Sequence, residues 1–325
     1  MGLRHHSRVK NPSAGAEAAA LRQSALVLVS HGASARVRLE GGEEVLAVPK
    51  RRGLQCVCGD EVTCESDGQH AQWQLGEIKP RRSALHRSNA RGGAELVAAN
   101  VTLLVVVIAP RPQPDLFVVD RYLAAAASAG IAALLLANKA DLAFDAATRD
   151  EIAALRSCGC GTLECSARSG AGLDSLRARM RGETVMLVGQ SGVGKSSLLR
   201  QLVPGSEAMV GELLKDDEGR HTTSAAQLYA LPGGGSLIDS PGVRDFAPAV
   251  EMLDAASLGF AEIATLAPQC RFADCVHLRE PQCAVRAAVE SGAISARRYE
   301  SYRRLRRLRE QLLERIPPAR RKPRA

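Results

Sequence analysis

The chain is poor in aromatic residues and has no long apolar run. Phe, Trp and Tyr make up 3% of its 325 residues, although 46% of the residues are hydrophobic. The core must therefore be built mainly from Leu, Val and Ala. The longest apolar run, residues 101–109, is far shorter than the roughly 20 residues of a membrane-spanning helix. The first residues show no signal-peptide pattern. We therefore expect a cytoplasmic protein with no membrane partner.

Positive charge is concentrated at one end of the chain. The whole sequence carries a net charge of +8, whereas residues 297–325 contain 12 Arg and Lys against three Glu, a net charge of +9. Such a block favours a polyanionic partner, nucleic acid before membrane. A solvated helix face with a disordered end is the alternative. We expect basic tails at residues 1–22 and 317–325.

Four side chains of the kinds that bind metals, three cysteines and one histidine, are closely spaced near the C-terminal end. In a reducing cytoplasm, clustered cysteines are better interpreted as metal ligands than as disulfides. The pattern C-x4-C-x-H-x5-C supplies three thiolates and one imidazole, the closed set of a structural Zn²⁺ site: Cys270, Cys275, His277 and Cys283. Three further cysteines have no fourth ligand at a familiar spacing, and we expect them to be buried or incidental: Cys56, Cys58 and Cys64.

The most specific motif is GQSGVGKSS at residues 189–197, which follows the apolar run 184–188. It fits G-x-x-x-x-G-K-[ST], in which backbone N–H groups surround phosphate oxygens at a helix N-terminus. Lys195 would reach the β- and γ-phosphates of a nucleotide, and the Ser196 hydroxyl would hold Mg²⁺. The candidate nucleotide-binding residues are Gly189, Gln190, Ser191, Gly192, Val193, Gly194, Lys195, Ser196 and Ser197.

A second motif, Asn138-Lys139-Ala140-Asp141, follows the apolar run 132–137 and predicts selection of guanine. The Asp141 carboxylate can accept hydrogen bonds from N1–H and N2–H₂, a donor pair that adenine lacks. Asn138 would tie this loop to the phosphate loop and the base, and the Lys139 stem would cover the ring face. Ser166 and Ala167, after a further strand candidate, would place a backbone N–H at guanine O6.

The remaining nucleotide-binding candidates lie downstream of the phosphate loop. Either Thr222 or Thr223 would complete Mg²⁺ coordination in a mobile loop. Asp239 would bind Mg²⁺ through water, and the Gly242 N–H would contact the γ-phosphate. The guanine motif precedes the phosphate loop, which is the reverse of the order in Ras-like proteins. This order indicates a circularly permuted GTPase, because compact domains tolerate displaced termini.

The distribution of strand and helix patterns predicts three domains. Five short strand candidates in residues 23–94 favour an all-β OB-fold barrel. Residues 95–247 alternate strands and helices, as in a doubly wound α/β domain with a mostly parallel sheet. Residues 248–316 would form a mostly helical zinc-binding domain.

Nucleic acid binding is expected from both ends of this arrangement. Because the barrel has only Trp73 as a stacking ring, RNA contact there would depend on Lys50, Arg51, Arg52, Lys79, Arg81, Arg82 and Arg87. A helix at residues 295–314 has an apolar stripe made of Tyr299, Tyr302, Leu305, Leu308 and Leu312. The arginines on its other faces would contact phosphates: Arg303, Arg304, Arg306, Arg307 and Arg309.

The combined pattern resembles the ribosome small-subunit-dependent GTPases, which join an OB-fold, a permuted GTPase domain and a zinc domain. The stretches that carry the resemblance are residues 78–87, 99–101, 120–123, 138–142, 189–198, 219–223 and 239–244 with the Cys/His set. Thr102 departs from it, since the family usually has Asp there. We expect a monomer that binds GTP and GDP with Mg²⁺. The resemblance implies contact with 16S rRNA and GTP hydrolysis stimulated by the small subunit late in its maturation.

The position that carries the water-orienting residue in Ras-like proteins is occupied here by a residue that cannot orient water. Val243 follows Gly242 where Ras-like proteins carry Gln, and valine cannot orient water. The resemblance points to His221 for this role; otherwise His221 only helps to order its loop. Two other functions use the same residues: an RNA-binding nucleotide switch with negligible hydrolysis, and a signalling GTPase with a protein partner. Multiple-turnover phosphate release distinguishes the first of them from a GTP hydrolase.

Overall fold

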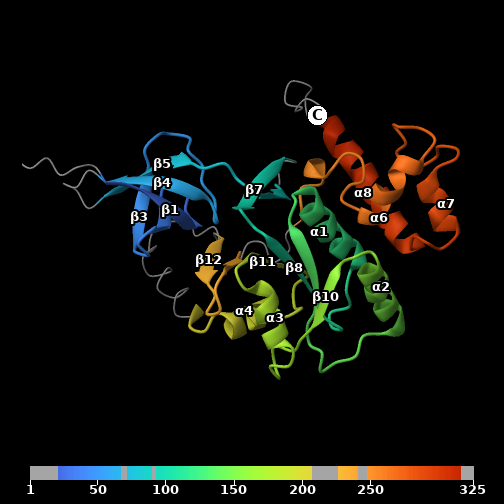
Figure 1. The fold of residues 1–325 in the computed structure, drawn as a ribbon, viewed down its shortest axis with the longest axis horizontal. Helices are drawn as coiled ribbons and strands as arrows, with labels where there is room; N and C mark the ends of the chain where they lie inside the picture. The colour runs from blue at the N-terminus through green and yellow to red at the C-terminus, as the bar shows by residue number, and fades with distance from the viewer. Residues whose placement is uncertain (1–20, 67–71, 90–92, 207–225, 241–246, 316–325) are drawn as a thin grey trace, which may run out of the picture.

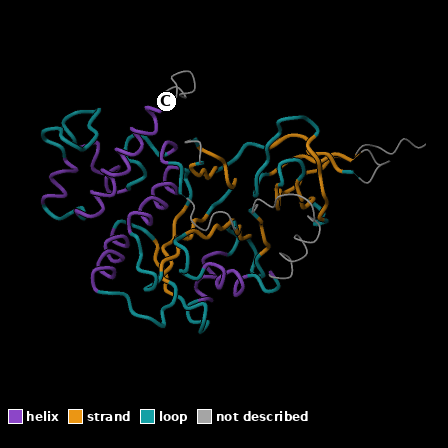
Figure 2. The backbone as a smooth tube through the Cα atoms, turned by 180° about the vertical axis from the view of Figure 1, so that it is seen from behind, coloured by secondary structure: helices purple, strands orange, loops and turns teal. Residues whose placement is uncertain are grey.

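The computed structural model describes residues 21–66, 72–89, 93–206, 226–240 and 247–315 (Figure 1). Four of the candidate residues named above lie outside these ranges: His221, Thr222, Thr223 and Gly242. Strands follow one another from the barrel into the central sheet, and the helices of the described residues gather around that sheet and in the C-terminal part (Figure 2).

The N-terminal strands form the closed barrel that the sequence predicts. They are β1 (Leu21–Ser30), β2 (Ala35–Leu39), β3 (Glu44–Pro49), β4 (Glu61–Ser66) and β5 (Trp73–Ile78). The pairing order is β1-β2-β3-β5-β4, and β4 also pairs with β1, which closes the barrel. Its interior is filled by small and branched side chains such as Val27, Val37 and Leu75. Cys56 and Cys64 belong to this core, and the buried Cys58 thiol donates to the Leu28 carbonyl at 3.3 Å.

A hairpin and a strand pairing that the sequence did not predict join the barrel to the next unit. Strands β6 (Ala84–Ser88) and β7 (Ala94–Ala99) form a separate two-stranded sheet. Val29 of β1 pairs with Gln227 of β12 (Gln227–Ala230), so that barrel and central sheet form one 11-stranded sheet. The domain boundary that we place at residues 94 and 95 therefore falls within the hairpin and stays a prediction.

The central sheet has the doubly wound order expected from the sequence. Its other strands are β8 (Leu103–Ile108), β9 (Ala132–Ala137), β10 (Gly161–Glu164), β11 (Thr184–Val188) and β13 (Ser236–Asp239). The order is β10-β9-β8-β11-β13-β12, and every pairing is parallel except that of β12 with β13. One face packs on α1 (Leu116–Ser128) and α2 (Ala146–Ser157). The other packs on α3 (Leu173–Met180) and α4 (Lys195–Leu202).

The C-terminal part is built from short helices and one long one. These are η2 (Val250–Met252), α6 (Ala261–Leu266), η3 (Ala267–Gln269), α7 (Ala284–Glu290) and α8 (Ala296–Arg315). The predicted stripe of α8 packs into this core through Tyr302 and Leu305. The prediction for Arg306 was wrong: this arginine is 6% exposed and donates to the Ala255 carbonyl, so it cannot meet a phosphate. Among the described helices, none is both long and apolar enough to cross a bilayer.

Candidate functional site

The candidate nucleotide residues meet at one edge of the central sheet. Asn138 and Asp141 follow β9, Ser166 follows β10, the phosphate loop at residues 189–197 follows β11, and Asp239 ends β13. These strands are parallel in one sheet, so their carboxyl ends face the same way. Ligands of open α/β sheets bind at this edge. The structure thus brings together motifs that are far apart in the sequence, from Asn138 to Asp239.

The conformation of the phosphate loop depends on hydrogen bonds from its own lysine and on a glycine with left-handed backbone angles. Lys195 opens α4, and its Nζ donates to the carbonyls of Gly189 at 2.5 Å and Gln190 at 2.7 Å. Gly194, immediately before, has φ +100°. A Cβ at this glycine would lie 2.3 Å from the Asn138 Nδ2, so the close approach requires glycine. The ammonium of Lys195 therefore lies where the loop carbonyls and the helix N-terminus converge.

One buried carboxamide ties the guanine-reading loop to the phosphate loop. Asn138 is 1% exposed, and its Nδ2 donates to the Val193 carbonyl at 2.8 Å. Its Oδ1 accepts from the Ala167 N–H at 3.1 Å. Lys139 adds a second tie, because its Nζ donates to the Arg111 and Gly192 carbonyls, each at 2.7 Å. The loops that follow β9, β10 and β11 are thus fixed relative to one another.

Asp141 is prepared to accept hydrogen bonds. The Ser166 hydroxyl donates to its Oδ1 at 2.7 Å, and this hydrogen bond holds the pKa of Asp141 below its usual range. The carboxylate is therefore ionised at neutral pH. Sequence reasoning assigned a role to the backbone after Ser166 and missed this contact of its hydroxyl. Because the Ala167 N–H bonds Asn138 in this structure, its contact with guanine O6 stays a prediction.

Gln190 has a role that its place in the motif did not indicate. Its side-chain Oε1 accepts from the Asp115 N–H at 2.8 Å. Asp115 is the N-cap residue of α1, and its own carboxylate accepts from the Phe117 and Val118 N–H groups. Gln190 stands at a variable position of the glycine motif, so the motif itself carries no signal for this contact. The phosphate loop is therefore bonded directly to the start of α1.

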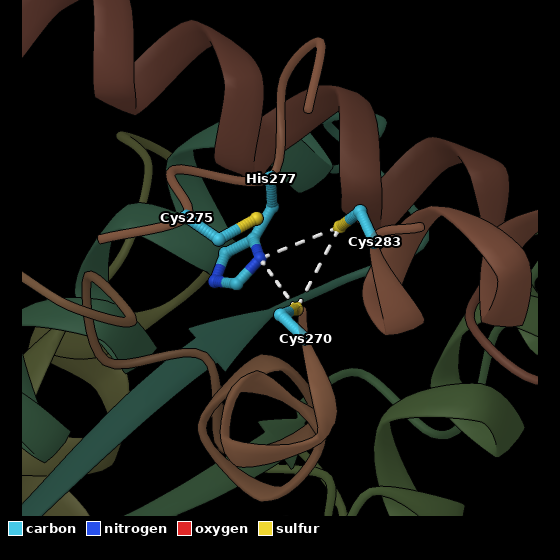
Figure 3. A group of neighbouring side chains, drawn as sticks. All are labelled: Cys270, Cys275, His277 and Cys283. Carbon is cyan, nitrogen blue, oxygen red and sulfur yellow. Dashed lines mark hydrogen bonds between the residues drawn. The ribbon is translucent and has the colours of Figure 1, made fainter. Parts of the chain in front are cut away.

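The predicted metal ligands form one compact cluster (Figure 3). The ligand atoms of the four side chains all lie within 4.8 Å of one another: Cys270, Cys275, His277 and Cys283. The His277 Nδ1 is 3.5 Å from the sulfurs of Cys270 and of Cys283, and these two sulfurs are 3.9 Å apart. A tetrahedral Zn²⁺ with usual bond lengths separates its ligands by about 3.3–3.8 Å. The donor set fits such a metal, and the separations among Cys270, His277 and Cys283 are close to these values.

Backbone N–H groups and two tyrosines shape the metal-binding loop. Burial raises the pKa of the Cys270 thiol, but hydrogen bonds from the N–H groups of Ala284 and Val285 and from the neighbouring cysteines together lower it, which favours the thiolate. The Tyr299 hydroxyl donates to the His277 carbonyl at 2.6 Å, and the Tyr302 hydroxyl donates to the Val276 carbonyl at 3.0 Å. The long helix α8 therefore holds the loop that carries the ligands.

Glu280 orders the same loop from within. Its carboxylate accepts from the N–H groups of Val276 at 3.2 Å, Leu278 at 2.9 Å and Arg279 at 3.0 Å. Burial raises the pKa of Glu280, but the backbone donors outweigh burial and lower the pKa to about 2. No sequence pattern indicates this role for Glu280, because a glutamate between metal ligands has no spacing rule of its own.

Comparison with known proteins decides the family. The model of the RsgA GTPase family matches residues 78–248, more than half of the chain. The chain belongs to the RsgA GTPase family. It is therefore a GTPase, a hydrolase, as the motifs predict. The small ribosomal subunit biogenesis GTPase RsgA of Azotobacter vinelandii is 43% identical over 291 residues, which cover 87% of this chain and 84% of the relative. The protein of that name from Pseudomonas aeruginosa (strain LESB58) is 45% identical over 254 residues, covering 77% and 74%.

Solved structures confirm the fold of this RsgA-family chain. YjeQ from Thermotoga maritima superimposes with a TM-score of 0.69 at 26% identity, covering 91% of this chain and all of YjeQ. YloQ, described as a circularly permuted GTPase, gives a TM-score of 0.64 at 24% identity, covering 97% and 99%. The permutation that the motif order predicts is thus confirmed.

Proposed function

We propose that this chain hydrolyses GTP as a late biogenesis factor of the small ribosomal subunit, acting as a cytoplasmic monomer that binds 16S rRNA. One observation carries the proposal: relatives named small ribosomal subunit biogenesis GTPase match most of this chain at 43–45% identity. The convergence of the guanine and phosphate motifs at one sheet edge supports the chemistry. The alternative of a switch with negligible hydrolysis is not favoured by membership in a GTPase family.

The residues at the sheet edge would divide the work of binding GTP. Asp141 would accept from guanine N1–H and N2–H₂, and its lowered pKa keeps it an acceptor. Backbone N–H groups of residues 189–197 and the Lys195 ammonium would hold the phosphates. The Ser196 hydroxyl would bind Mg²⁺, with Asp239 acting through a water molecule. Either Thr222 or Thr223 and the Gly242 N–H would complete these contacts.

Hydrolysis requires a group that orients the attacking water, and we assign this role to His221. The position that usually carries this group cannot supply it, because the residue after Gly242 is Val243. We expect His221→Ala to lower subunit-stimulated turnover and to leave GTP affinity within about twofold. Unchanged stimulated turnover would remove His221 from the mechanism.

The contacts of the described arginines and lysines indicate which of them would be available to bind rRNA. Most basic residues predicted for this purpose on the barrel are already in ion pairs: Lys50 with Glu65, Arg81 with Asp60, Arg82 with Glu61 and Arg87 with Glu95. Arg51 and Arg52, after β3, are exposed and form no ion pair within the described ranges. With the exposed Arg307 of α8, they would contact phosphates of rRNA, and this binding should weaken steeply with salt.

Zn²⁺ would serve structure in this protein. Three thiolates and one imidazole leave no open position for a substrate, so the metal would close the loop of residues 270–283 and supply no catalytic step. Metal content measured by emission spectroscopy should be one zinc per chain.

The deciding experiment is multiple-turnover phosphate release with purified small subunits, with large subunits and without either. We expect slow turnover alone and stimulation by small subunits only, since partners that complete GTPase sites contribute about 10³–10⁵-fold. Lys195→Ala should abolish both rates. Equal turnover with and without small subunits would refute the proposal.

A further inference from the structure

Helix α1 contacts the phosphate loop at one end and the C-terminal part of the chain at the other. Its N-cap residue Asp115 donates its N–H to the Gln190 side chain. Its last residue, Ser128, accepts from the Asp254 N–H at 2.9 Å. A helix of 13 residues is about 20 Å long. One element therefore connects the phosphate loop to the C-terminal part of the chain.

Asp120 of α1 fixes the first turn of α8. Its side chain is 0% exposed, and its two oxygens accept from Arg297 Nη1 and Arg298 Nη1, each at 2.5 Å. Arg298 also bonds Glu262 through Nε at 2.6 Å, and Arg297 Nε is 2.7 Å from Glu151. A buried carboxylate held by two guanidinium groups permits few arrangements of the two helices. Helix α8 is the element whose tyrosines hold the metal loop.

Arg121, the next residue, fixes the start of the C-terminal part at Pro248. Its Nε and Nη2 both donate to the Pro248 carbonyl, at 3.1 and 2.5 Å. On its other side this segment is bonded to the β6 strand, because Ala249 N–H donates to the His86 carbonyl at 3.0 Å. Successive residues of a helix point about 100° apart, so Asp120 and Arg121 reach different elements from adjacent positions.

Gly259 shows how closely this segment lies on α1. It has φ +79°, and a Cβ there would lie 2.3 Å from the Ala124 carbonyl oxygen. The stretch of residues 247–260 thus touches the C-terminal half of α1 at Arg121, Ala124 and Ser128.

We propose that Asp120 and Arg121 are positioning residues that make α1 the link between the phosphate loop and the metal-binding part. They hold residues 247–260 and α8 to the helix whose N-cap is bonded to Gln190. A change in the phosphate loop on exchange of GTP for GDP is therefore transmitted along α1, and subunit contact at α8 acts back on nucleotide affinity by the same coupling free energy. The subunit half of this inference rests on the proposed function.

The first test uses the full chain alone and measures amide hydrogen exchange with a non-hydrolysable GTP analogue and with GDP. In the wild type, the amides of residues 247–260 should exchange at different rates in the two states. Arg121→Met should remove the difference, while zinc content and both nucleotide affinities stay within about twofold. Arg121→Lys keeps one donor for the Pro248 carbonyl and should retain part of the difference in exchange rate. Arg177→Met is the matched control, since Arg177 also donates to a backbone carbonyl, Gln201 at 3.0 Å, but lies on α3.

The second test measures small-subunit affinity with the GTP analogue and with GDP. Coupling between sites typically changes affinity about 5- to 150-fold. We expect a ratio in that range for the wild type and below about twofold for Arg121→Met and Asp120→Asn. Variants that keep the wild-type ratio and exchange difference would overturn the inference, as would a wild type without any exchange difference. A wild type that binds no subunits in either state would instead refute the proposed function, and the exchange experiment would still decide the role of α1.

Discussion

The close approach of Gly194 to Asn138 makes Gly194→Ala a sharp test of the nucleotide site. Two costs add at this position. A side chain at φ +100° costs about 1–2 kcal/mol of backbone strain. The new Cβ would also lie 2.3 Å from the Asn138 Nδ2, which must then leave the Val193 carbonyl. A buried donor without a partner costs about 1–3 kcal/mol. We expect the free energy of unfolding to fall by about 2–5 kcal/mol in total.

The second of these costs acts on binding, because the displaced carboxamide holds the phosphate loop. A loss of about 1–3 kcal/mol corresponds to about 5- to 150-fold weaker binding of GDP and GTP. The assay is a fluorescence titration with a labelled GDP and a labelled GTP analogue, together with thermal unfolding of the free chain.

Gly205→Ala separates the cost of backbone strain from the cost of displacing the Asn138 carboxamide. Gly205 has φ +84°, but no atom lies within 4 Å of the Cβ that it would gain. This variant should lose about 1–2 kcal/mol of stability and no nucleotide affinity. Wild-type affinity in Gly194→Ala, or an equal loss of affinity in both variants, would contradict the geometry described for the loop.

Four other changes test separate parts of the molecule. Asp141→Asn should weaken GTP binding at least about tenfold, since one charged hydrogen bond contributes about 1.5–3 kcal/mol, and competition titration with XTP checks whether base selection has moved. Cys283→Ser should lower zinc content from one per chain toward zero and reduce the unfolding temperature, measured by emission spectroscopy and calorimetry. The pKa of Glu280 is lowered to about 2, so its stabilising effect is present above its ordinary pKa of 4.5 and is lost as pH falls toward 2; Glu280→Gln should unfold more easily than the wild type at pH 7, and the difference should shrink below pH 4.5. Replacing Arg51 and Arg52 with Glu should weaken subunit binding and reduce the slope of log affinity against log salt by about 2.

The parts of the site that the sequence predicts are those in which chemistry is local. The phosphate loop needs a lysine and glycines within nine residues of chain, so its spacing alone identifies it. The same is true of the Asn138 motif. It is also true of the metal ligands, because all four come from one short segment that would surround a single ion. The order of these motifs also revealed the permutation, because order is a property that the sequence states directly.

The parts that it does not predict depend on pairings between distant segments. Nothing in the short run around Val29 indicates that it would pair with Gln227 and merge the barrel with the central sheet. Arg306 lies among arginines of identical local pattern, and only the packing of α8 decides that it is buried while Arg307 is exposed. Gln190 is an arbitrary residue of its motif until α1 is placed beside it.

The buried cluster around Asp120 contributes orientation more than stability. Removing charged groups from water costs several kcal/mol per ion, and apolar side chains of the same volume often pack two elements equally well. Apolar packing would, however, let α8 rotate on α1, whereas a carboxylate between two guanidinium groups has few favourable geometries. The turn of α8 that is fixed in this way precedes Tyr299 and Tyr302, which hold the metal loop. We infer that the charges keep that loop in one orientation relative to the nucleotide-binding edge, as the proposed link through α1 requires.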